Sequence, residues 1–488
     1  HPKYKLLEPD ELEVVIQKTG KSKELDELIV DSVKLDEESD YSKRVRELIE
    51  RKRIRFTNAL AELKDDPRFP FPDGPREYQK EAYTNWVKND YSGIFAMATG
   101  TGKTITSLNC ALNEYRKSNS YRFIILVPSI ALLKQWEKEV AQFYFKRTLL
   151  VGGGNNWKKE FANYVSDFEW GEKKDLVILA TYDSFILDQF QKLFKKVSID
   201  FLLIADEAHN MGSENRIKVF ENLDIEKKIG LSATPKRVYD PKGTDRIKDF
   251  FNDQEPFTYS YSIKDALGKF LTEYKYYPII VELDEEEIQE YQALTKKLLR
   301  YFHFKTGKFK EHPQVQKLLL IRKSIIHKAV NKIAAFTSII GELKKENLAQ
   351  YVFAYVPEGY RRGEEKKERI IDSFIKSTAE QYSDLRMNSY TAADEDLDDL
   401  LRGFSEGKIE VLFAMKMLDE GVDVPRAEVG IFASSTGNPR QFIQRRGRLL
   451  RKHPDKQIAT IYDMVLISPQ APYETSEFKL ERNLIKNE

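Results

Sequence analysis

The stretch GIFAMATGTGKTITSLNCAL, residues 93–112, decides the fold class of this 488-residue chain. It begins with a short apolar run, passes through a turn rich in glycine and threonine, and ends in a segment with helical spacing. This pattern predicts a buried strand, a tight turn and a helix that begins near Lys103. Backbone N–H groups converge at such a turn and at the helix start, so the stretch indicates a site for phosphate.

The turn predicts ligands for a triphosphate and for the magnesium ion that accompanies it. Lys103 would place positive charge on the β and γ phosphates, and Thr104 would give its hydroxyl to Mg²⁺. Met97 stands where the general pattern G-x-x-x-x-G-K-[ST] has its first glycine, and a chance Gly-Lys-Thr loop is the alternative interpretation. We therefore expect ATP and Mg²⁺ as cofactors. The expected contacts in the turn are Thr99, Gly100, Thr101, Gly102, Lys103 and Thr104.

Two acids follow another apolar run in FLLIADEAHN, residues 201–210. Asp206 and Glu207 end this predicted strand, so we expect them at the carboxyl edge of the sheet, where open α/β folds bind ligands. Asp206 would reach Mg²⁺ directly or through water, and Glu207 would orient and deprotonate the attacking water. An acid pair that caps the next helix is the alternative.

A cluster of arginines in QRRGRLLR, residues 444–451, predicts positive charge from a second domain. Arg448 and Arg451 are three residues apart, so both face the same way on a helix. Guanidinium groups match phosphate geometry and stay protonated at neutral pH. An ordinary basic surface is the alternative interpretation of this run taken alone.

Short, continuously apolar runs recur along the chain and predict two parallel sheets. Runs of roughly four to eight residues without alternation suit strands that are covered on both faces. Helix-patterned segments separate these runs, which indicates βαβ units and an α/β fold class with doubly wound parallel sheets. The runs are 93–97, 123–127, 176–180, 201–205 and 228–233 in a first domain and 351–356, 411–415, 429–434 and 458–465 in a second.

Changes in pattern predict the domain boundaries. The proline-rich segment DPRFPFPDGP, residues 66–75, follows a charged, helix-patterned stretch. The chain opens on His1 rather than on methionine, so we expect it to be part of something longer. The predicted divisions are a helical N-terminal arm or remnant of an upstream domain (1–70), an ATP-binding domain (71–255), a connector with a helical insertion (256–332), a second α/β domain (333–466) and a C-terminal extension (467–488).

Composition excludes several classes of protein. Hydrophobic residues make up 41% and aromatic residues 12% of the chain, which argues against wholesale disorder. Lysine and arginine number 79 against 78 acidic residues, so any basic surface must be local. A single cysteine, Cys110, excludes an internal disulfide and suits a reducing compartment, so we expect a cytoplasmic protein, or a nuclear one in a eukaryote. No run approaches the roughly 20 apolar residues of a membrane span, so we expect no membrane partner.

The motifs and their order resemble superfamily 2 helicases of the DEAH type. The resemblance covers residues 75–465 and is greatest to the branch that contains restriction-enzyme translocase subunits and excision-repair helicases. MATGTGKT, residues 97–104, resembles motif I, and DEAH, residues 206–209, resembles motif II. The resemblance implies two RecA-like domains that close on ATP and are joined by a helical connector.

Further motifs of the first domain imply contacts with the base and with the nucleic-acid strand. REYQ (76–79) resembles the adenine-reading motif, LVPSIALLKQW (126–136) and ATYDSF (180–185) resemble strand-contacting motifs, and LSATP (231–235) resembles motif III. His209 would couple motif II to motif VI, with a structural hydrogen bond at a helix start as the alternative. The implied residues are Arg76 and Gln79 at the base, Pro128, Ser129, Gln135 and Thr181 at the strand, and Ser232 and Thr234 in coupling.

Motifs of the second domain imply the other half of the nucleotide site. YVFAYV (351–356) resembles motif IV, MLDEGVDVP (417–425) resembles motif V, and QRRGRLLR (444–451) resembles motif VI. The implied residues are Gly421 and Asp423 near the ribose and the domain interface, Gln444 in coupling, and Arg448 and Arg451 as arginine fingers.

The expected function is that of an ATP-dependent DNA helicase or translocase, such as the motor of a restriction, defence or repair system. Its expected partners are nucleic acid, with DNA favoured over RNA, and a nuclease or other subunits of a larger complex. An RNA helicase and a nucleotide-switched scaffold subunit are the alternatives. Trp136 could stack on bases, but an aromatic residue beside an apolar run favours the core.

Overall fold

The computed structural model describes residues 66–172, 174–237, 240–303, 308–310, 312–360, 368–390, 397–415, 424, 426–434 and 439–466. Most of the predicted N-terminal arm and the whole predicted C-terminal extension lie outside these residues. Of the described residues, 66–77 form a compact unit with Ala141–Phe145. In that unit Arg68 N–H donates to Phe143 O at 3.0 Å, and the Phe69 and Phe143 rings pack edge to face.

The first lobe is built on a seven-stranded sheet in the order β3-β4-β2-β5-β6-β1-β7. Every neighbouring pair is parallel. The five strands predicted in this lobe are confirmed, and their continuous apolar sequences are buried because helices cover both faces. The strands are β1 (Ser92–Met97), β2 (Arg122–Val127), β3 (Thr148–Val151), β4 (Leu176–Thr181), β5 (Leu202–Ala205), β6 (Lys228–Ser232) and β7 (Tyr259–Tyr261).

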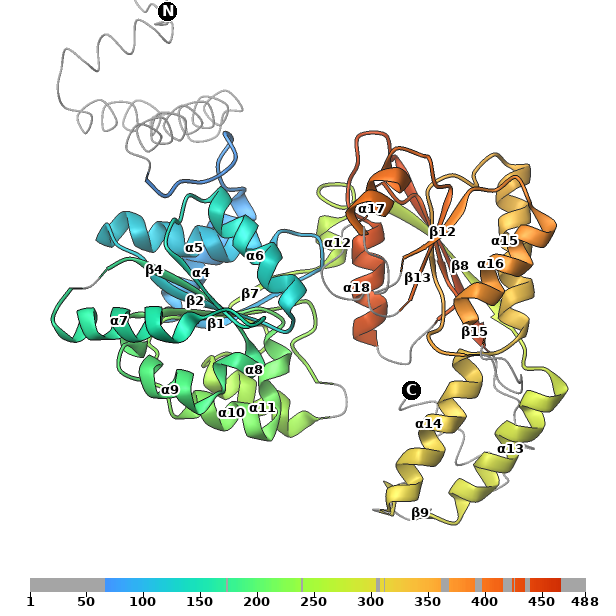
Figure 1. Cartoon of the computed structure of the whole chain (residues 1–488), viewed down its shortest axis with the longest axis horizontal. Helices are drawn as coiled ribbons and strands as arrows, with labels where there is room; N and C mark the ends of the chain where they lie inside the picture. The colour runs from blue at the N-terminus through green and yellow to red at the C-terminus, as the bar shows by residue number, and fades with distance from the viewer. Residues whose placement is uncertain are drawn as a thin grey trace, which may run out of the picture. The chain divides into compact units, whose positions relative to one another are not determined.

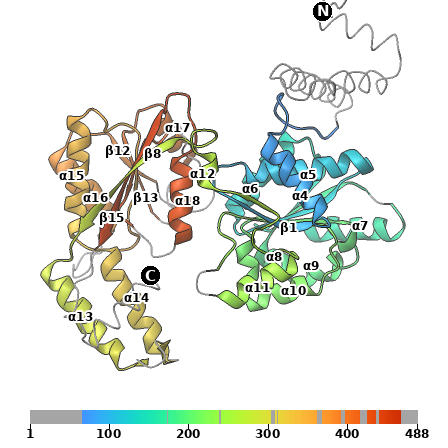
Figure 2. The same ribbon diagram turned by 180° about the vertical axis from the view of Figure 1, so that it is seen from behind.

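Helices cover both faces of this first sheet, as Figures 1 and 2 show. On one face lie α4 (Glu77–Lys88), α5 (Lys103–Ser118) and α6 (Ile130–Gln142), and α7 (Trp157–Glu169) follows β3. On the other face lie α8 (Tyr182–Phe185), α9 (Asp188–Phe194), α10 (Glu214–Glu221) and α11 (Pro241–Phe250). The core of this lobe contains both aliphatic and aromatic side chains, and Phe185 stacks on Phe220 with ring centroids 5.0 Å apart.

The second lobe has a six-stranded sheet in the order β12-β13-β11-β14-β15-β8, again with parallel pairs throughout. Figure 1 shows α15 and α16 on one face and α17 and α18 on the other. The predicted α/β class with two doubly wound lobes is therefore confirmed. The elements are β8 (Glu273–Val281), α15 (Asn331–Lys345), β11 (Val352–Tyr355), α16 (Ile370–Gln381), β12 (Met387–Tyr390), α17 (Leu397–Ser405), β13 (Val411–Ala414), β14 (Val429–Phe432), α18 (Pro439–Leu449) and β15 (Ile458–Leu466).

The segment 256–332 contributes strands to both sheets as well as helices. β7 is an edge strand of the first sheet and β8 an edge strand of the second, with α12 (Ile263–Ala266) between them. A helical hairpin follows, made of α13 (Glu285–Leu299), the short strands β9 (Phe302–His303) and β10 (Lys308–Phe309), and α14 (Pro313–His327). None of the described helices combines the length and the apolar character needed to cross a membrane.

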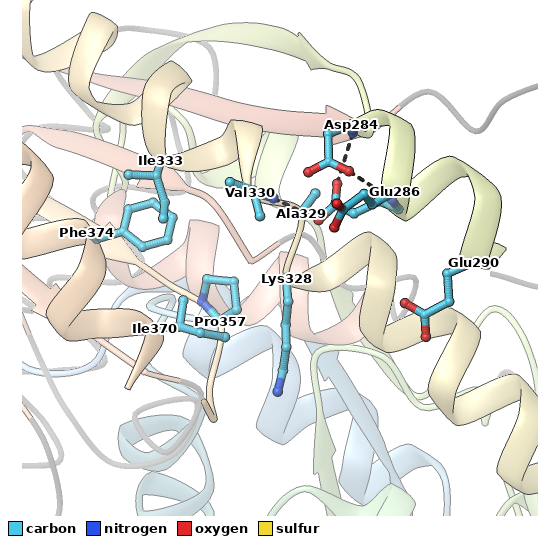
Figure 3. Close-up of a pocket in the computed structure, with 11 residues that line it drawn as sticks. Asp284, Glu286, Glu290, Lys328, Ala329, Val330, Ile333, Pro357, Ile370 and Phe374 are labelled. Carbon is cyan, nitrogen blue, oxygen red and sulfur yellow. Dashed lines mark hydrogen bonds between the residues drawn. The ribbon is translucent and has the colours of Figure 1, made fainter. Parts of the chain in front are cut away.

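A cavity of about 160 Å³ lies where this hairpin joins the second lobe (Figure 3). Asp284 and Glu287 on its wall form a capping box at the start of α13, in which Glu287 N–H donates to Asp284 Oδ1 at 2.8 Å. Glu287 Oε1 also accepts from Val330 N–H at 3.0 Å. These acids therefore fix α13 to the start of α15, while Ile333 and Phe374 line the apolar side of the cavity.

A buried arginine holds the two helices of the hairpin together. Arg322 on α14 is fully buried, its guanidinium carbon lies 4.2 Å from the centre of the Tyr291 ring, and it donates to the Tyr291 hydroxyl. Arg322 Nε also donates to Thr295 Oγ1 at 3.2 Å. A buried charge needs such acceptors because its desolvation is expensive.

We predict that Tyr291→Phe destabilises the hairpin by about 1–3 kcal/mol, because a buried guanidinium loses an acceptor. Hydrogen exchange of the α13 and α14 amides in the whole chain measures this effect. The matched control is Tyr301→Phe, which removes an exposed hydrogen bond to Gln314 in the same hairpin. Equal exchange in the two variants would contradict the assignment of Arg322 as the residue that joins the helices.

Candidate active site

The predicted phosphate turn lies between β1 and α5. Gly100 and Gly102 have φ angles of +83° and +82°, a left-handed conformation that glycine adopts at low cost. Tyr78 Oη donates to Thr101 O at 2.6 Å, and Thr101 Oγ1 donates to Ala98 O at 2.7 Å. These bonds fix the conformation of the turn that precedes α5.

Lys103, the first residue of α5, reaches the acids that follow β5. Its Nζ lies 3.3 Å from Glu207 Oε1, and both side chains are mostly buried. On the other oxygen of the same carboxylate, His209 Nδ1 lies 3.3 Å from Glu207 Oε2. His209 Nδ1 is also 3.4 Å from Ser232 Oγ, and that hydroxyl accepts from Thr234 N–H at 3.2 Å. The structure thus brings five predicted site residues into one chain of polar contacts.

Asp206 is held at both its side chain and its main chain. Trp136 Nε1 donates to Asp206 Oδ2 at 2.8 Å, and Glu207 N–H donates to Asp206 Oδ1 at 2.9 Å. The Tyr182 hydroxyl donates to the main-chain oxygen of Asp206 at 2.7 Å, and Asp206 N–H donates to Leu126 O at 2.8 Å. The position of this carboxylate is therefore set by β2 and by the segments that follow β2 and β4.

Burial and charge act in opposite directions on the two acids. Burial and the neighbouring charge of Glu207 raise the pKa of Asp206, although Lys103 opposes this. Burial disfavours the ionised form of Glu207 too, but the Lys103 ammonium and the His209 ring outweigh it and lower its pKa. Glu207 is consequently ionised at neutral pH.

The backbone at Glu207 is unusual for a residue with a side chain. Its φ of +45° lies in the left-handed region, and the short 3-10 helix Ala208–Gly212 follows directly. Such a conformation is sparsely populated by residues other than glycine, asparagine and aspartate, and it is found where a site requires it. The turn directs the Glu207 carboxylate toward Lys103 and His209 instead of along β5.

The predicted strand-contacting residues follow two neighbouring strands. Pro128 and Ser129 come directly after β2, and Thr181 ends β4, which pairs with β2 so that Val127 lies opposite Thr181. Thr181 also caps α8 by accepting from Ser184 N–H at 3.2 Å. Gln135 is half-buried on α6. Pro128, Ser129 and Thr181 therefore lie together at the carboxyl edge of the sheet.

The arginine helix α18 carries Gln444 and Arg448 as buried residues, and Arg451 follows its end. A Cβ atom built on Gly447 of this helix would lie 2.6 Å from Thr99 Cβ, so α18 approaches the phosphate turn at a glycine. The same turn carries Gly100, whose hypothetical Cβ would lie 3.2 Å from Gly447 O and 3.5 Å from Arg451 Cγ. Motif VI and motif I are thus adjacent.

The remaining predicted nucleotide contacts differ in where they lie. Gln79 is buried on α4, and its Nε2 lies 3.6 Å from where a Cβ would stand on Gly102. Arg76 is exposed just before α4. Gly421 and Asp423 lie outside the described residues.

The donor set fits a nucleotide with Mg²⁺. Within the described ranges, no three or more His, Cys, Asp or Glu side chains come together as a metal-binding group. Mg²⁺ does not need such a group, because one or two carboxylates together with phosphate oxygens can hold it. Two buried carboxylates face one ammonium, and Thr99 Oγ1 is buried without a hydrogen bond to any described residue, so both a cation and a ligand oxygen would be accommodated. Thr104 and Asp206 carry the side-chain oxygens that are predicted to hold the ion.

Trp136 and Tyr182 are site residues that the motifs did not identify as such. Trp136 is buried, as predicted for a core residue, but its indole N–H is used by Asp206. A second missed feature is Gly152–Gly154, a loop after β3 whose glycines all have positive φ. The sequence signal for this loop was the run of three glycines after an apolar segment. For the hydrogen bond between Trp136 and Asp206, the sequence contains no signal.

Two family models match the chain in the two lobes. Residues 73–237 match "Type III restriction enzyme, res subunit", and residues 364–453 match "Helicase conserved C-terminal domain". The first match contains the phosphate turn and both acids, and the second contains α18.

Curated relatives and a solved structure agree with these matches. The chain is 27% identical over 402 residues to "DNA 3'-5' translocase XPB2" of Sulfurisphaera tokodaii, covering 79% of this chain and 80% of that protein. It is 28% identical over 221 residues to the "Type I restriction enzyme EcoAI endonuclease subunit" of Escherichia coli, covering 43% of this chain and 25% of that protein. The fold is similar to that of the "ATP-dependent Type ISP restriction-modification enzyme LlaBIII bound to DNA", with a TM-score of 0.53, 17% identity and coverage of 85% of this chain and 29% of that one.

The matches in both lobes and the ordered motifs between them agree with the site geometry. The chain is similar to superfamily 2 helicases, close to their restriction and repair branches, and the matches support an ATP-hydrolysing enzyme that acts on nucleic acid.

Proposed function

We propose that this chain is the motor of a DNA-processing system, an ATP-driven translocase or helicase that moves along DNA. The observation that carries the proposal is the meeting of Lys103, Glu207 and Asp206 beside a glycine turn at the carboxyl edge of a parallel sheet. DNA is favoured over RNA because the relatives include a DNA translocase and a restriction-enzyme subunit. We also propose that it works with a nuclease or other subunits of a larger complex.

In this proposal the first lobe binds the triphosphate. Lys103 holds the β and γ phosphates, the glycine turn and Thr99 surround them, and Gln79 with Arg76 contacts the base. Thr104 and Asp206 would hold Mg²⁺, which when bound would neutralise charge that develops on the transferred phosphoryl group. Glu207, ionised and fixed by its two partners, accepts a proton from the water that attacks the γ phosphate.

The second lobe would supply the opposite side of the site. Arg448 and Arg451 stabilise negative charge on the phosphates, because guanidinium groups fit phosphate oxygens and remain charged. Four residues would couple the motifs to the presence of ATP or ADP in the site: Gln444, His209, Ser232 and Thr234. Gly421 and Asp423 are proposed near the ribose, outside the described residues.

Strand movement would follow from contacts with the DNA backbone. Pro128, Ser129, Gln135 and Thr181 are proposed to hold the strand, which needs no sequence recognition because backbone contacts position without specifying. We propose domains at 71–255 and 333–466, and the connector 256–332 would transmit motion between them as the lobes close and open. The N-terminal arm and the C-terminal extension remain proposed divisions.

The proposal predicts that DNA raises ATP turnover. Turnover of the wild type is measured in parallel with no polymer, single-stranded DNA, duplex DNA and RNA. Stimulation by RNA alone would make the chain an RNA helicase, and stimulation by none would make it a nucleotide-switched scaffold. Either outcome contradicts a DNA motor.

We predict that Lys103→Ala lowers ATP turnover by at least about 100-fold. The substitution removes the ammonium that would stabilise negative charge on the transferred phosphoryl group. It should also weaken ATP binding, measured by calorimetry, because Lys103 contacts the phosphates before reaction. The control is Lys117→Ala at the far end of α5, which removes contacts with Glu114, Tyr91 and Tyr83. If Lys103→Ala behaved like the control, the phosphate site would be misassigned.

We predict that Arg448→Ala lowers turnover by about 1,000-fold or more while ADP still binds, since an arginine finger acts mainly on the transition state. Turnover and ADP affinity are measured on the same preparation. Lys452→Ala is the control, because the Lys452 side chain is a nearby cation that donates to Gly268 O on the surface. Intact turnover in Arg448→Ala would refute a site shared by the two lobes.

A further inference from the structure

Trp136 is the one tryptophan that contacts the proposed metal ligand among the described residues. It lies on α6 with 2% of its surface exposed, and its Nε1 is 2.8 Å from Asp206 Oδ2. The other oxygen, Oδ1, accepts from Glu207 N–H at 2.9 Å. Each oxygen of the carboxylate is thus fixed by one donor, and each retains acceptor capacity because an ionised carboxylate has about four lone-pair sites.

A hydrogen bond is needed here because the carboxylate can otherwise rotate. The terminal torsion of aspartate is broad and roughly two-fold, so packing alone does not define the plane of the group. A tryptophan ring has two side-chain torsions, and this one is packed in the core, so its N–H has a defined direction. The direction of that N–H is therefore set by the position of α6.

The same helix carries residues proposed to hold the DNA strand. Gln135 precedes Trp136 directly, and Ser129 lies just before the start of α6. Tyr182 is placed in a similar way. Its hydroxyl donates to Asp206 O at 2.7 Å, and it directly follows Thr181, another residue proposed to hold the strand. Both side chains that hold Asp206 are thus neighbours in sequence of proposed strand contacts.

We infer that Trp136 is a positioning residue, whose indole N–H orients the Asp206 carboxylate for Mg²⁺ and makes that orientation depend on the placement of α6 against the strand. Binding of DNA along α6 would thereby change the metal site without any DNA contact to the nucleotide. The second half of this inference rests on the proposed function.

The test compares Trp136→Phe with Trp86→Phe. Both variants keep an aromatic ring and lose a buried indole N–H bond in the first lobe, since Trp86 Nε1 donates to Lys228 O at 3.0 Å. ADP affinity is measured by calorimetry with Mg²⁺ and with EDTA. In Trp136→Phe the gain in affinity due to Mg²⁺ should fall about tenfold or more, as for other residues that orient a metal ligand, while affinity in EDTA stays that of the wild type. Trp86→Phe should retain the full gain.

A double-mutant cycle separates positioning from general damage to the fold. On an Asp206→Ala background, Trp136→Phe should cause no further loss of the Mg²⁺-dependent gain, because the group that it orients is absent. A further loss there, or a Trp136→Phe variant that matches Trp86→Phe, would overturn the positioning role. Loss of ADP affinity in EDTA would also overturn it, because it would reveal a structural effect.

The link to the strand has its own readout. The ratio of ATP turnover with single-stranded DNA to turnover without it should fall in Trp136→Phe and stay unchanged in Trp86→Phe. An unchanged ratio in Trp136→Phe would overturn the link to α6. If no polymer stimulated the wild type, the proposed function itself would fail, and the calorimetric comparison would still decide whether Trp136 positions Asp206.

Discussion

The burial of two carboxylates beside a single ammonium is the constraint on which the site depends. Asp206 and Glu207 are adjacent in sequence and mostly removed from water, and buried charges are tolerated only when they are paired or hydrogen-bonded. Lys103 and His209 each lie 3.3 Å from an oxygen of Glu207, whereas Asp206 is held by neutral donors from Trp136 and the backbone. Among the described residues no salt bridge reaches Asp206, although the Lys103 charge acts on it, and a divalent ion that arrives with an anionic nucleotide would supply positive charge there.

The order of the strands explains why these groups meet. In a parallel sheet every strand ends at the same edge, and here the order β4-β2-β5-β6-β1 places β5 between the strands of the proposed DNA contacts and the strand of the phosphate turn. Asp206 follows this central strand. Its side chain can be reached from α6, which follows β2, and its neighbour Glu207 can be reached from α5, which follows β1. The contact from Trp136 thus joins segments that follow neighbouring strands, β2 and β5, whereas β6 lies between β5 and the strand of the phosphate turn.

Physical reasons explain why some strands and contacts could be predicted from the sequence and others could not. The central strands are apolar throughout because both faces are covered, so 93–97 and 201–205 were recognised as β1 and β5. The strand β8 was not predicted, because most of its residues are exposed at an edge of the second sheet and do not show the pattern of a buried strand. Local motifs likewise predicted Lys103 and Asp206 as site residues. The bond from Trp136 joins residues 70 positions apart, and sequence spacing carries no information about such a pair.

The route between the two sheets connects the phosphate turn to the arginine segment by hydrogen bonds. Ala98 N–H, at the start of the turn, donates to Tyr261 O in β7 at 2.9 Å. At the other end of this short route, Thr272 N–H donates to Leu450 O at 2.8 Å, and Leu271 forms an isolated antiparallel bridge with Arg451. Both ends of the segment from Tyr261 to Thr272 are therefore tied to groups that the proposed site places around the same phosphates. In the proposed ATP cycle, a displacement of Arg451 relative to the turn would have to be absorbed within those few residues, so the connector would take part in the cycle.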